Sequence, residues 1–245
     1  ELDMRKSLVE ALQSIPQAAD VAWSLYGDNS EPPIQEVILP FTTSAEELSL
    51  IETYYREHIV GHELDYLVGN RRVRDWVGEF FPKSIRVIPL IEDLEHLLHA
   101  DTIVKEHIDK KSLPYQRVFL ARSDPALNYG HISSELMLKL ALDRLHSLEA
   151  GVGVPIYPII GVGAVPFRGH LNPTNVNRAL VEYPSTQTFT IQSAFKYDYD
   201  KDTVRSGIHE IMAHKRGAPT PIDAKVSLDI IDRFTAEYQS KVRIL

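Results

Sequence analysis

Short hydrophobic runs alternate along the chain with longer amphipathic segments. Each run is continuously apolar rather than alternating with polar residues, which is typical of strands buried on both faces of a parallel sheet. The runs begin about 30 to 50 residues apart, the spacing of strand–helix units with inserted loops. The pattern predicts five strands, at Glu36–Leu39, Arg86–Leu90, Arg117–Ala121, Pro155–Gly161 and Gln187–Gln192.

Helix start signals lie between the predicted strands. Ser44–Glu47 fits a capping box, in which the Ser and Glu side chains satisfy backbone N–H groups of the first turn. Asn172–Pro173 and Thr220–Pro221 each fit an N-cap followed by proline at the first helical position. Ile132–Leu148 carries apolar residues three and four positions apart, so it predicts a helix with one buried face.

The alternation of strands and helices predicts an α/β fold with parallel strands and right-handed crossovers. A (β/α)8 barrel of the TIM type and an open doubly wound sheet both satisfy this pattern. Five strands are fewer than a barrel needs, so either weak strands lie near Asp20–Tyr26 and Glu63–Val68 or the barrel is incomplete in this chain. We interpret residues 1–245 as a single, partial β/α barrel domain.

The composition is that of a globular protein and excludes several functions. The 245 residues are 44% hydrophobic and 24% charged, with a formal net charge of −8. This surplus of acids disfavours non-specific nucleic-acid binding, which needs cations to displace counterions. The absence of cysteine excludes disulfides, thiolate nucleophiles and cysteine-ligated metals. The longest uncharged apolar stretch, Gly151–Phe167, is interrupted by prolines, so we expect no membrane-spanning helix.

Carboxylates follow two consecutive predicted strands. Active sites of parallel α/β folds lie beyond the carboxyl ends of the strands, and Glu92, Asp93 and Asp124 stand at such positions. Mg²⁺ takes one or two carboxylates and completes its octahedron with water and substrate oxygens. Structural roles stay open as well, because acids favour the first turn of a helix and Asp124 precedes Pro125 as a turn or N-cap residue does.

Other polar residues follow the same strands. Arg122 and Ser123 directly precede Asp124. Arg168 lies in a glycine-rich loop after the fourth predicted strand, and Gln192 ends the fifth. An arginine offers a rigid fork of donors to a carboxylate or phosphate, although Arg168 also fits an ordinary surface loop. Two acids and an arginine at one edge of a sheet are what a divalent cation and an anionic substrate need.

Three familiar motifs fail on their spacing. The acids from Asp198 begin like an EF-hand loop, but Thr203 stands where glycine is required. His209 and His214 resemble the two histidine ligands of a zinc-protease helix, which are four residues apart. Here they are five residues apart, which rotates the second imidazole away from the first on a helix. The pair Gly161 and Gly163 leads into a proline rather than a helix, so it does not form a dinucleotide-binding loop.

The strand-end segments, taken together, form motifs in a recognisable order. The pieces Ala-Arg-Ser-Asp and Pro-Phe-Arg-Gly are the more specific ones. With these motifs the sequence resembles archaeal-type phosphoenolpyruvate carboxylase across most of its length. The matching segments are Val87–Leu94, Ala121–Ala126, Pro166–Pro173 and Thr188–Ala194, with Leu39–Ser44 as a less specific match.

The resemblance implies a phosphoenolpyruvate/pyruvate-type (β/α)8 barrel that uses Mg²⁺ or Mn²⁺. The implied enzyme is a lyase that converts phosphoenolpyruvate and bicarbonate to oxaloacetate and phosphate. Glu92 and Asp124 would be the metal ligands, and Arg168 would bind substrate and act in catalysis. The remaining pocket residues would be Ser123 and Gln192 for substrate binding and Arg122 as a second catalytic arginine.

The resemblance also implies a mechanism and a cellular setting. Bicarbonate would attack phosphorus to give carboxyphosphate and the enolate of pyruvate. The metal would stabilise the enolate oxygen, an arginine would offset charge on the phosphoryl group, and the released carbon dioxide would be captured by the enolate. The intact enzyme would be a cytoplasmic homo-oligomer, a dimer or tetramer, without nucleic-acid or membrane partners.

The sequence lacks two segments that members of this family carry. Members carry an amino-terminal Gln-His-Pro-Asp segment with a proposed catalytic histidine and a long carboxyl-terminal helical portion, which these 245 residues lack. We therefore expect an internal fragment that is inactive or nearly so by itself. Two alternatives stay open: a Mg²⁺-dependent aldolase or lyase of the same superfamily, which the Ala-Arg-Ser-Asp motif disfavours, and a non-catalytic barrel segment for assembly or ligand binding.

Overall fold

The computed structural model describes residues 2–27, 31–109 and 111–242. The described residues group into two compact units. One unit takes in Glu1–Leu39 and Glu46–Ile88, and the other takes in Pro40–Ala45 and Pro89–Leu245. The strand β4 (Arg86–Ile91) runs from the first unit into the second.

A five-stranded sheet confirms the five strands that the hydrophobic runs predict. Its strands lie in the order β1-β4-β5-β6-β7, so each strand lies beside the next one of the sheet along the chain. The pairs β4–β5, β5–β6 and β6–β7 are parallel. The bounds are β1 (Glu36–Leu39), β4 (Arg86–Ile91), β5 (Gln116–Leu120), β6 (Ile156–Ile160) and β7 (Thr188–Phe189).

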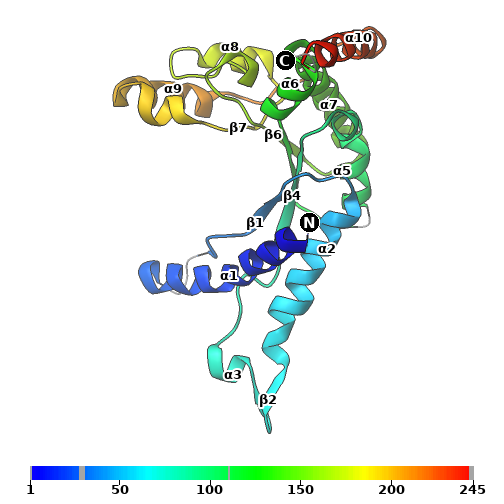
Figure 1. Cartoon of the computed structure of the whole chain (residues 1–245). Helices are drawn as coiled ribbons and strands as arrows, with labels where there is room; N and C mark the ends of the chain where they lie inside the picture. Colours follow the sequence, from blue (N-terminus) through cyan, green and yellow to red (C-terminus); the bar gives the residue numbers. More distant parts are fainter. Residues whose placement is uncertain (1, 28–30, 110, 243–245) are drawn as a thin grey trace. The chain divides into compact units, whose positions relative to one another are not determined.

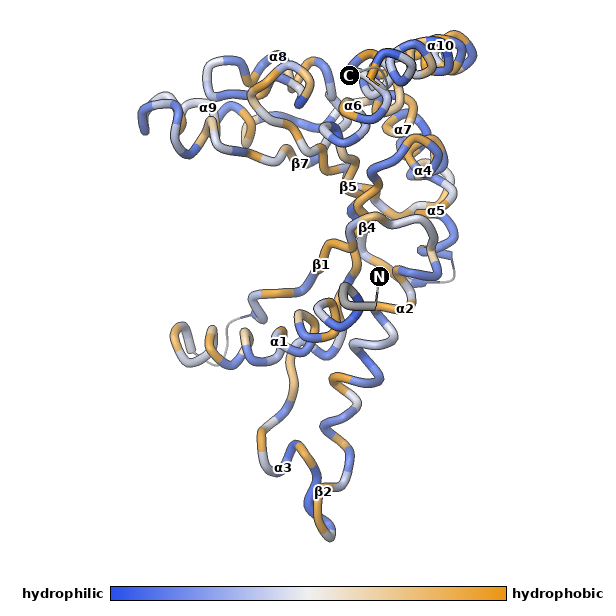
Figure 2. The backbone as a smooth tube through the Cα atoms, in the orientation of Figure 1, coloured by the Kyte–Doolittle hydropathy of each residue, from blue (hydrophilic) through white to orange (hydrophobic). Residues whose placement is uncertain are grey.

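The strands of the second unit are buried as their composition predicts. The side chains of Val118, Leu120 and Ile160 have no exposed surface, and the apolar colouring of β4 and β5 is visible in Figure 2. Strands covered on both faces need apolar side chains on both faces, which explains why these runs do not alternate.

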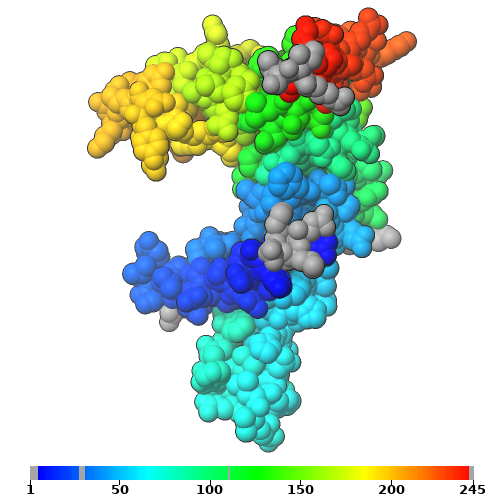
Figure 3. All heavy atoms as spheres, viewed as in Figure 1, coloured from blue at the N-terminus to red at the C-terminus, as the bar shows by residue number. Residues whose placement is uncertain are grey.

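Helices of the second unit pack around the long helix α7 (His131–Val152). This helix covers the segment predicted from its apolar stripe, and Met137, Leu140 and Leu145 on that stripe are buried. It contacts α4, α5, α6 and α10, and α10 lies against α6 and α7 in Figures 1 and 3. The other elements are α4 (Leu94–Leu98), α5 (Ala100–Ile108), α6 (Ser123–Tyr129), η3 (Pro166–Arg168), α8 (Val176–Glu182), η4 (Ala194–Asp198), α9 (Lys201–Ala213) and α10 (Ala224–Val242).

The first unit is mainly helical and carries a small antiparallel hairpin. The ring of Trp23 meets that of Phe81 edge to face at 4.9 Å, and the Tyr55 hydroxyl donates to the Pro82 carbonyl at 2.9 Å. Its elements are α1 (Leu2–Tyr26), α2 (Ala45–Tyr54), η1 (Tyr55–Val60), η2 (Gly61–Leu64), β2 (Tyr66–Val68), β3 (Arg71–Arg72) and α3 (Arg74–Val77).

The two weak barrel strands considered above are not part of the parallel sheet. Asp20–Tyr26 lies inside α1, where Leu12, Ile15 and Ala19 continue a buried helical face. Glu63–Val68 contains β2, which pairs antiparallel with β3 across a turn at Gly69, whose φ of 60° favours glycine.

Two helices begin later than their Asn-Pro and Thr-Pro signals predict. Asn172 accepts hydrogen bonds from the N–H and hydroxyl of Thr174 at 3.0 and 2.8 Å, so it closes a turn, and α8 begins only at Val176. At the Thr220–Pro221 signal, the carboxylate of Asp223 accepts a hydrogen bond from the N–H of Val226 at 3.0 Å. Asp223 therefore replaces the predicted Thr220 as the capping residue of α10.

Among the described residues, no helix has both the length and the apolar character needed to cross a bilayer.

Candidate active site

Glu92 lies directly after β4, at the carboxyl end of the strand. Its Oε2 accepts a hydrogen bond of 2.8 Å from the backbone N–H of Phe41. Phe41 has a φ of 53°, in the left-handed region that a bulky residue rarely adopts. This unusual backbone turns the Phe41 N–H toward the carboxylate and fixes one of the two Glu92 oxygens.

The carboxylates of Glu92 and Asp124 lie within electrostatic reach of each other. Burial raises the pKa of Glu92, the hydrogen bond from Phe41 opposes this, and the negative charges of Asp124 and Asp93 raise the pKa further. The charge of Asp124 therefore acts on Glu92, as expected for acids that follow consecutive parallel strands.

Asp124 and Asp93 differ in how far their oxygens are engaged. Asp93 is the N-cap of α4, because it accepts from the N–H of His96 at 3.0 Å and lies 2.6 Å from the His96 Nδ1. Asp124 is exposed in the first turn of α6, and within the described residues no hydrogen bond or ion pair engages its carboxylate. Asp93 thus takes the N-cap role considered for these acids, and Asp124 stands in the first turn of a helix, the other structural position considered.

Arg168 lies in η3, after β6, and reaches two other residues of the predicted site. Its Nε donates to the Ser123 hydroxyl at 3.0 Å, and its Nη1 donates to the Gln192 amide oxygen at 3.1 Å. A guanidinium has five N–H donors, so these bonds orient the exposed fork and leave donors for an anion. Ser123 begins α6, Arg168 ends η3 and Gln192 lies after β7, and the structure brings these three residues together.

Glycine at position 163 makes this arrangement possible. A Cβ atom there would lie 2.5 Å from the Gln192 Oε1 and 3.3 Å from the Arg168 Cβ. The glycine-rich loop therefore serves close packing under the bond between Arg168 and Gln192. It is not a phosphate-binding turn at the start of a helix, in agreement with the sequence analysis.

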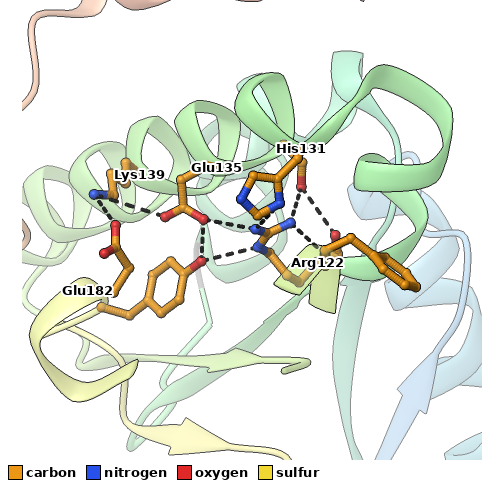
Figure 4. Close-up of polar contacts among 8 residues, drawn as sticks. Arg122, His131, Glu135, Lys139 and Glu182 are labelled. Atoms are coloured by element: carbon orange, nitrogen blue, oxygen red, sulfur yellow. Dashed lines mark hydrogen bonds and ion pairs between the residues drawn. The ribbon is translucent and has the colours of Figure 1, made fainter. Parts of the chain in front are cut away.

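Arg122 lies in a different environment from Arg168, since its side chain is 1% exposed. Its Nε donates to the Tyr183 hydroxyl at 3.2 Å, and its Nη1 donates to the Ser134 hydroxyl at 3.1 Å and the Phe167 carbonyl at 2.8 Å. The Nη2 lies 3.2 Å from the His131 Nδ1 and 3.1 Å from the Glu135 Oε2. Figure 4 shows this cluster.

All five N–H donors of Arg122 thus face partners within the chain. The sequence analysis places Arg122 in the pocket as a second catalytic arginine, but this arrangement leaves no donor of the side chain for a substrate. Because a guanidinium only donates, the His131 Nδ1 facing it must accept. Burial and the charge of Arg122 both lower the pKa of His131, which agrees with a neutral ring.

Two acids and a tyrosine complete the cluster around Arg122. The Tyr183 hydroxyl donates to the Glu135 Oε2 at 2.6 Å, and Lys139 pairs with Glu182. Burial raises the pKa of Glu135 and raises that of Tyr183 well above its ordinary value, where the negative charge of Glu135 adds to the effect. Burial also acts to raise the pKa of Glu182, but the pairing with Lys139 outweighs it, so that pKa is lowered.

The residues at the strand ends fit a substrate-facing divalent cation. Within the described residues no three His, Asp or Glu side chains gather as in a closed metal site. Two carboxylates are what Mg²⁺ takes when water and substrate oxygens fill its other positions. Glu92 and Asp124 provide this donor set, and the free oxygens of both carboxylates are available to a cation.

The partners of Arg122 are the functional residues that sequence reasoning missed. Glu135 and Lys139 lie four residues apart on α7, which is a recognisable helical pair. Tyr183 is 61 positions from Arg122, and no local pattern marks it as a partner.

Comparisons with known proteins agree on one family. A family profile described as phosphoenolpyruvate carboxylase matches residues 1–245. The phosphoenolpyruvate carboxylase of Methanospirillum hungatei is 46% identical over 241 residues, which cover 98% of this chain and 50% of that protein. Those of Methanothermobacter thermautotrophicus and Pyrococcus furiosus are 45% and 44% identical and cover 97% and 100% of the chain. The chain spans about half the length of these curated relatives, 49% and 51% in the latter two.

Proposed function

Because the chain belongs to the archaeal-type phosphoenolpyruvate carboxylase family, we propose that it forms part of an enzyme that carboxylates phosphoenolpyruvate. The substrates are phosphoenolpyruvate and bicarbonate, and the products are oxaloacetate and phosphate. The observation that carries the proposal is the pair of hydrogen bonds from Arg168 to Ser123 and Gln192, beside the electrostatic coupling of Glu92 to Asp124, all after successive strands of the sheet.

Glu92 and Asp124 hold Mg²⁺ or Mn²⁺ in this proposal. The Phe41 N–H keeps one oxygen of Glu92 in place, and the unengaged Asp124 carboxylate is free to turn toward the cation. When bound, the cation would supply positive charge that stabilises negative charge developing on a substrate oxygen. Its positive charge would also favour the ionised form of Glu92, whose pKa is raised by burial and by the neighbouring acids.

Arg168 binds the anionic substrate. Its guanidinium is already oriented by Ser123 and Gln192, so little side-chain freedom is lost when an anion binds. A planar fork of donors matches the oxygens of a phosphoryl group or carboxylate. Positive charge fixed in this position offsets the charge that develops while the phosphoryl group moves to bicarbonate.

Further expectations complete the proposal. The strands lie in the sheet in the same order as they occur along the chain. This favours a TIM-type (β/α)8 barrel over a doubly wound sheet, in which the strand order reverses part-way across the sheet. The five strands of the sheet would be staves of that barrel. We also propose a cytoplasmic homo-oligomer.

Product analysis of the complete product of the gene that encodes this chain tests the function. With phosphoenolpyruvate, Mg²⁺ and bicarbonate, oxaloacetate and phosphate should form in equal amounts, and neither should form without bicarbonate or after chelation of the cation. Cleavage or aldol chemistry without bicarbonate would identify a lyase of another kind. Binding of phosphoenolpyruvate without any turnover would indicate a non-catalytic module.

A further inference from the structure

Two successive residues at the start of α6 contact the loop that carries Arg168. The Arg122 Nη1 holds the carbonyl of Phe167, which belongs to the peptide bond leading into Arg168. Ser123 holds the Arg168 guanidinium. The backbone of Arg168 and its side chain are therefore fixed from adjacent positions of one turn.

The loop that carries Arg168 is closed on itself by backbone hydrogen bonds. The N–H of Gly163 donates to the Arg168 carbonyl at 2.7 Å, and the N–H of Leu171 donates to the Gly163 carbonyl at 2.8 Å. Such a loop moves as a unit, so a strong external bond to the Phe167 backbone carbonyl helps to set where the whole loop lies. Arg122 supplies a bond of this kind, with a charged donor.

The buried cluster holds Arg122 itself in a single orientation. Ser134 both accepts from the Arg122 Nη1 and donates to the Arg122 carbonyl at 3.1 Å. Glu135 balances the guanidinium charge, and Tyr183 joins Glu135 to the Arg122 Nε (Figure 4). A buried arginine is costly unless every donor is satisfied, so a cluster of this completeness permits little movement.

We propose that Arg122 is a positioning residue that places Arg168 for substrate binding through the Phe167 carbonyl. This inference rests on the proposed function for its kinetic consequence, but its structural part concerns only the placement of the loop. Arg122 acts through Arg168 and does not contact the substrate.

Arg122→Lys in the complete gene product is the direct test. Lysine keeps a positive charge for Glu135, but its single ammonium cannot span Phe167, Ser134 and Tyr183 as the fork does. We expect kcat/KM for phosphoenolpyruvate to fall about 100-fold, as for a misplaced binding group, while Mn²⁺ affinity stays at the wild-type value. Tyr183→Phe is the comparison variant, because it removes the bond on the Nε and leaves the Nη1 on Phe167; its kcat/KM should fall much less than that of Arg122→Lys.

A second measurement reports the loop position without catalysis. Trypsin cleavage after Arg168 should accelerate in Arg122→Lys relative to cleavage after Lys215, an exposed reference site outside the loop. This cleavage ratio should rise much less in Tyr183→Phe, which keeps the Nη1 bond to Phe167. Ser134→Ala, which removes one hydroxyl from the same Nη1, is a milder variant and should raise the ratio to an intermediate value.

The outcomes separate the two proposals. A wild-type protein without carboxylation would contradict the proposed function, while the cleavage ratio would still test Arg122. An active Arg122→Lys protein with wild-type kcat/KM and an unchanged ratio would overturn the positioning role. Equal falls in kcat/KM in Arg122→Lys and Tyr183→Phe would also overturn it, because they would indicate a general loss of stability. If Arg122→Lys does not fold, an unchanged ratio in Ser134→Ala overturns the inference.

Discussion

Glu92 and Asp93 are adjacent acids in sequence, yet they have different surroundings. Asp93 is engaged as a helix N-cap, whereas the Phe41 N–H holds one oxygen of Glu92 and the charge of Asp124 raises the pKa that burial has already raised. Both residues are acids, and both follow the same strand. Asp93 binds the first turn of α4, which follows it directly in the chain. Glu92 instead binds the N–H of Phe41, which lies 51 positions earlier.

Sequence therefore predicts which residues gather at the site better than what each one does. The end of each strand, and hence Glu92, Asp124 and Arg168, can be located from hydrophobic runs because parallel strands end at one edge. The burial of Arg122 could not be predicted in this way, since it depends on Tyr183, which directly follows α8.

Gly163→Ala tests the packing beneath Arg168. The new methyl group would displace the far end of the flexible Gln192 side chain and so break its bond to Arg168. We expect kcat/KM for phosphoenolpyruvate to fall about tenfold through loss of orientation, with a change of about 1 kcal/mol or less in unfolding free energy. Steady-state kinetics and urea denaturation of the complete gene product measure both quantities.

Gly151→Ala is the matched control for that substitution. Gly151 lies in α7 with open space where a Cβ would be, so alanine should leave kcat/KM unchanged and stabilise the helix by about 0.5 to 1 kcal/mol. Normal kinetics in Gly163→Ala would show that the contact between Gln192 and Arg168 is not needed for binding.

At the scale of elements, strands were easier to predict than helix ends. A buried strand is marked by its whole run of apolar residues, so all five were located within a few residues. A helix start depends on one cap, and several polar residues compete for it. Asn172 closes a turn with Thr174, and Asp223 rather than Thr220 caps α10, so both starts moved toward the carboxyl terminus.

Glu63 in η2 bonds to the segment that precedes β4. Because these bonds favour its charged form, the stability of the first unit should depend on pH. It accepts from the Phe80 N–H and from Lys83, each at 3.0 Å. Burial acts to raise the pKa of Glu63, but these hydrogen bonds and the Lys83 charge lower it below its ordinary value of 4.5. A lowered folded-state pKa means that the stabilisation is present above the ordinary value and is lost as the pH falls through the folded value.

Glu63→Gln should therefore lower the unfolding free energy at pH 7 by about 1 kcal/mol, because the ion pair and a charge-assisted hydrogen bond are lost. The difference from wild type should shrink toward zero as the pH falls well below 4.5, where the wild-type carboxyl is itself protonated. Urea denaturation at a series of pH values measures this difference. A penalty that is independent of pH would show that shape, and not charge, is what Glu63 contributes.

At the scale of the whole molecule, the chain has two compact units joined through β4 and one parallel sheet in sequential order. The sequence predicts the parallel sheet because continuous apolar runs alternate with amphipathic helices. It does not predict that the first unit forms a compact group of its own. The hairpin and the π-helical turn of this unit depend on a few local contacts, such as the turn at Gly69. The strands of the sheet carry the proposed site on loops that all follow their carboxyl ends.

The central claim is that Glu92 and Asp124 together hold the divalent cation. Mn²⁺ titration of the complete gene product, followed by electron paramagnetic resonance, measures this directly for wild type, Glu92→Gln, Asp124→Asn and Asp93→Asn. The Asn variant at Asp93 keeps a good N-cap and serves as the control. The account predicts one tight Mn²⁺ site per chain in wild type and Asp93→Asn and its loss in Glu92→Gln and Asp124→Asn, with all four proteins folded. Retention of the tight site in Asp124→Asn, or its loss in Asp93→Asn alone, would contradict the account.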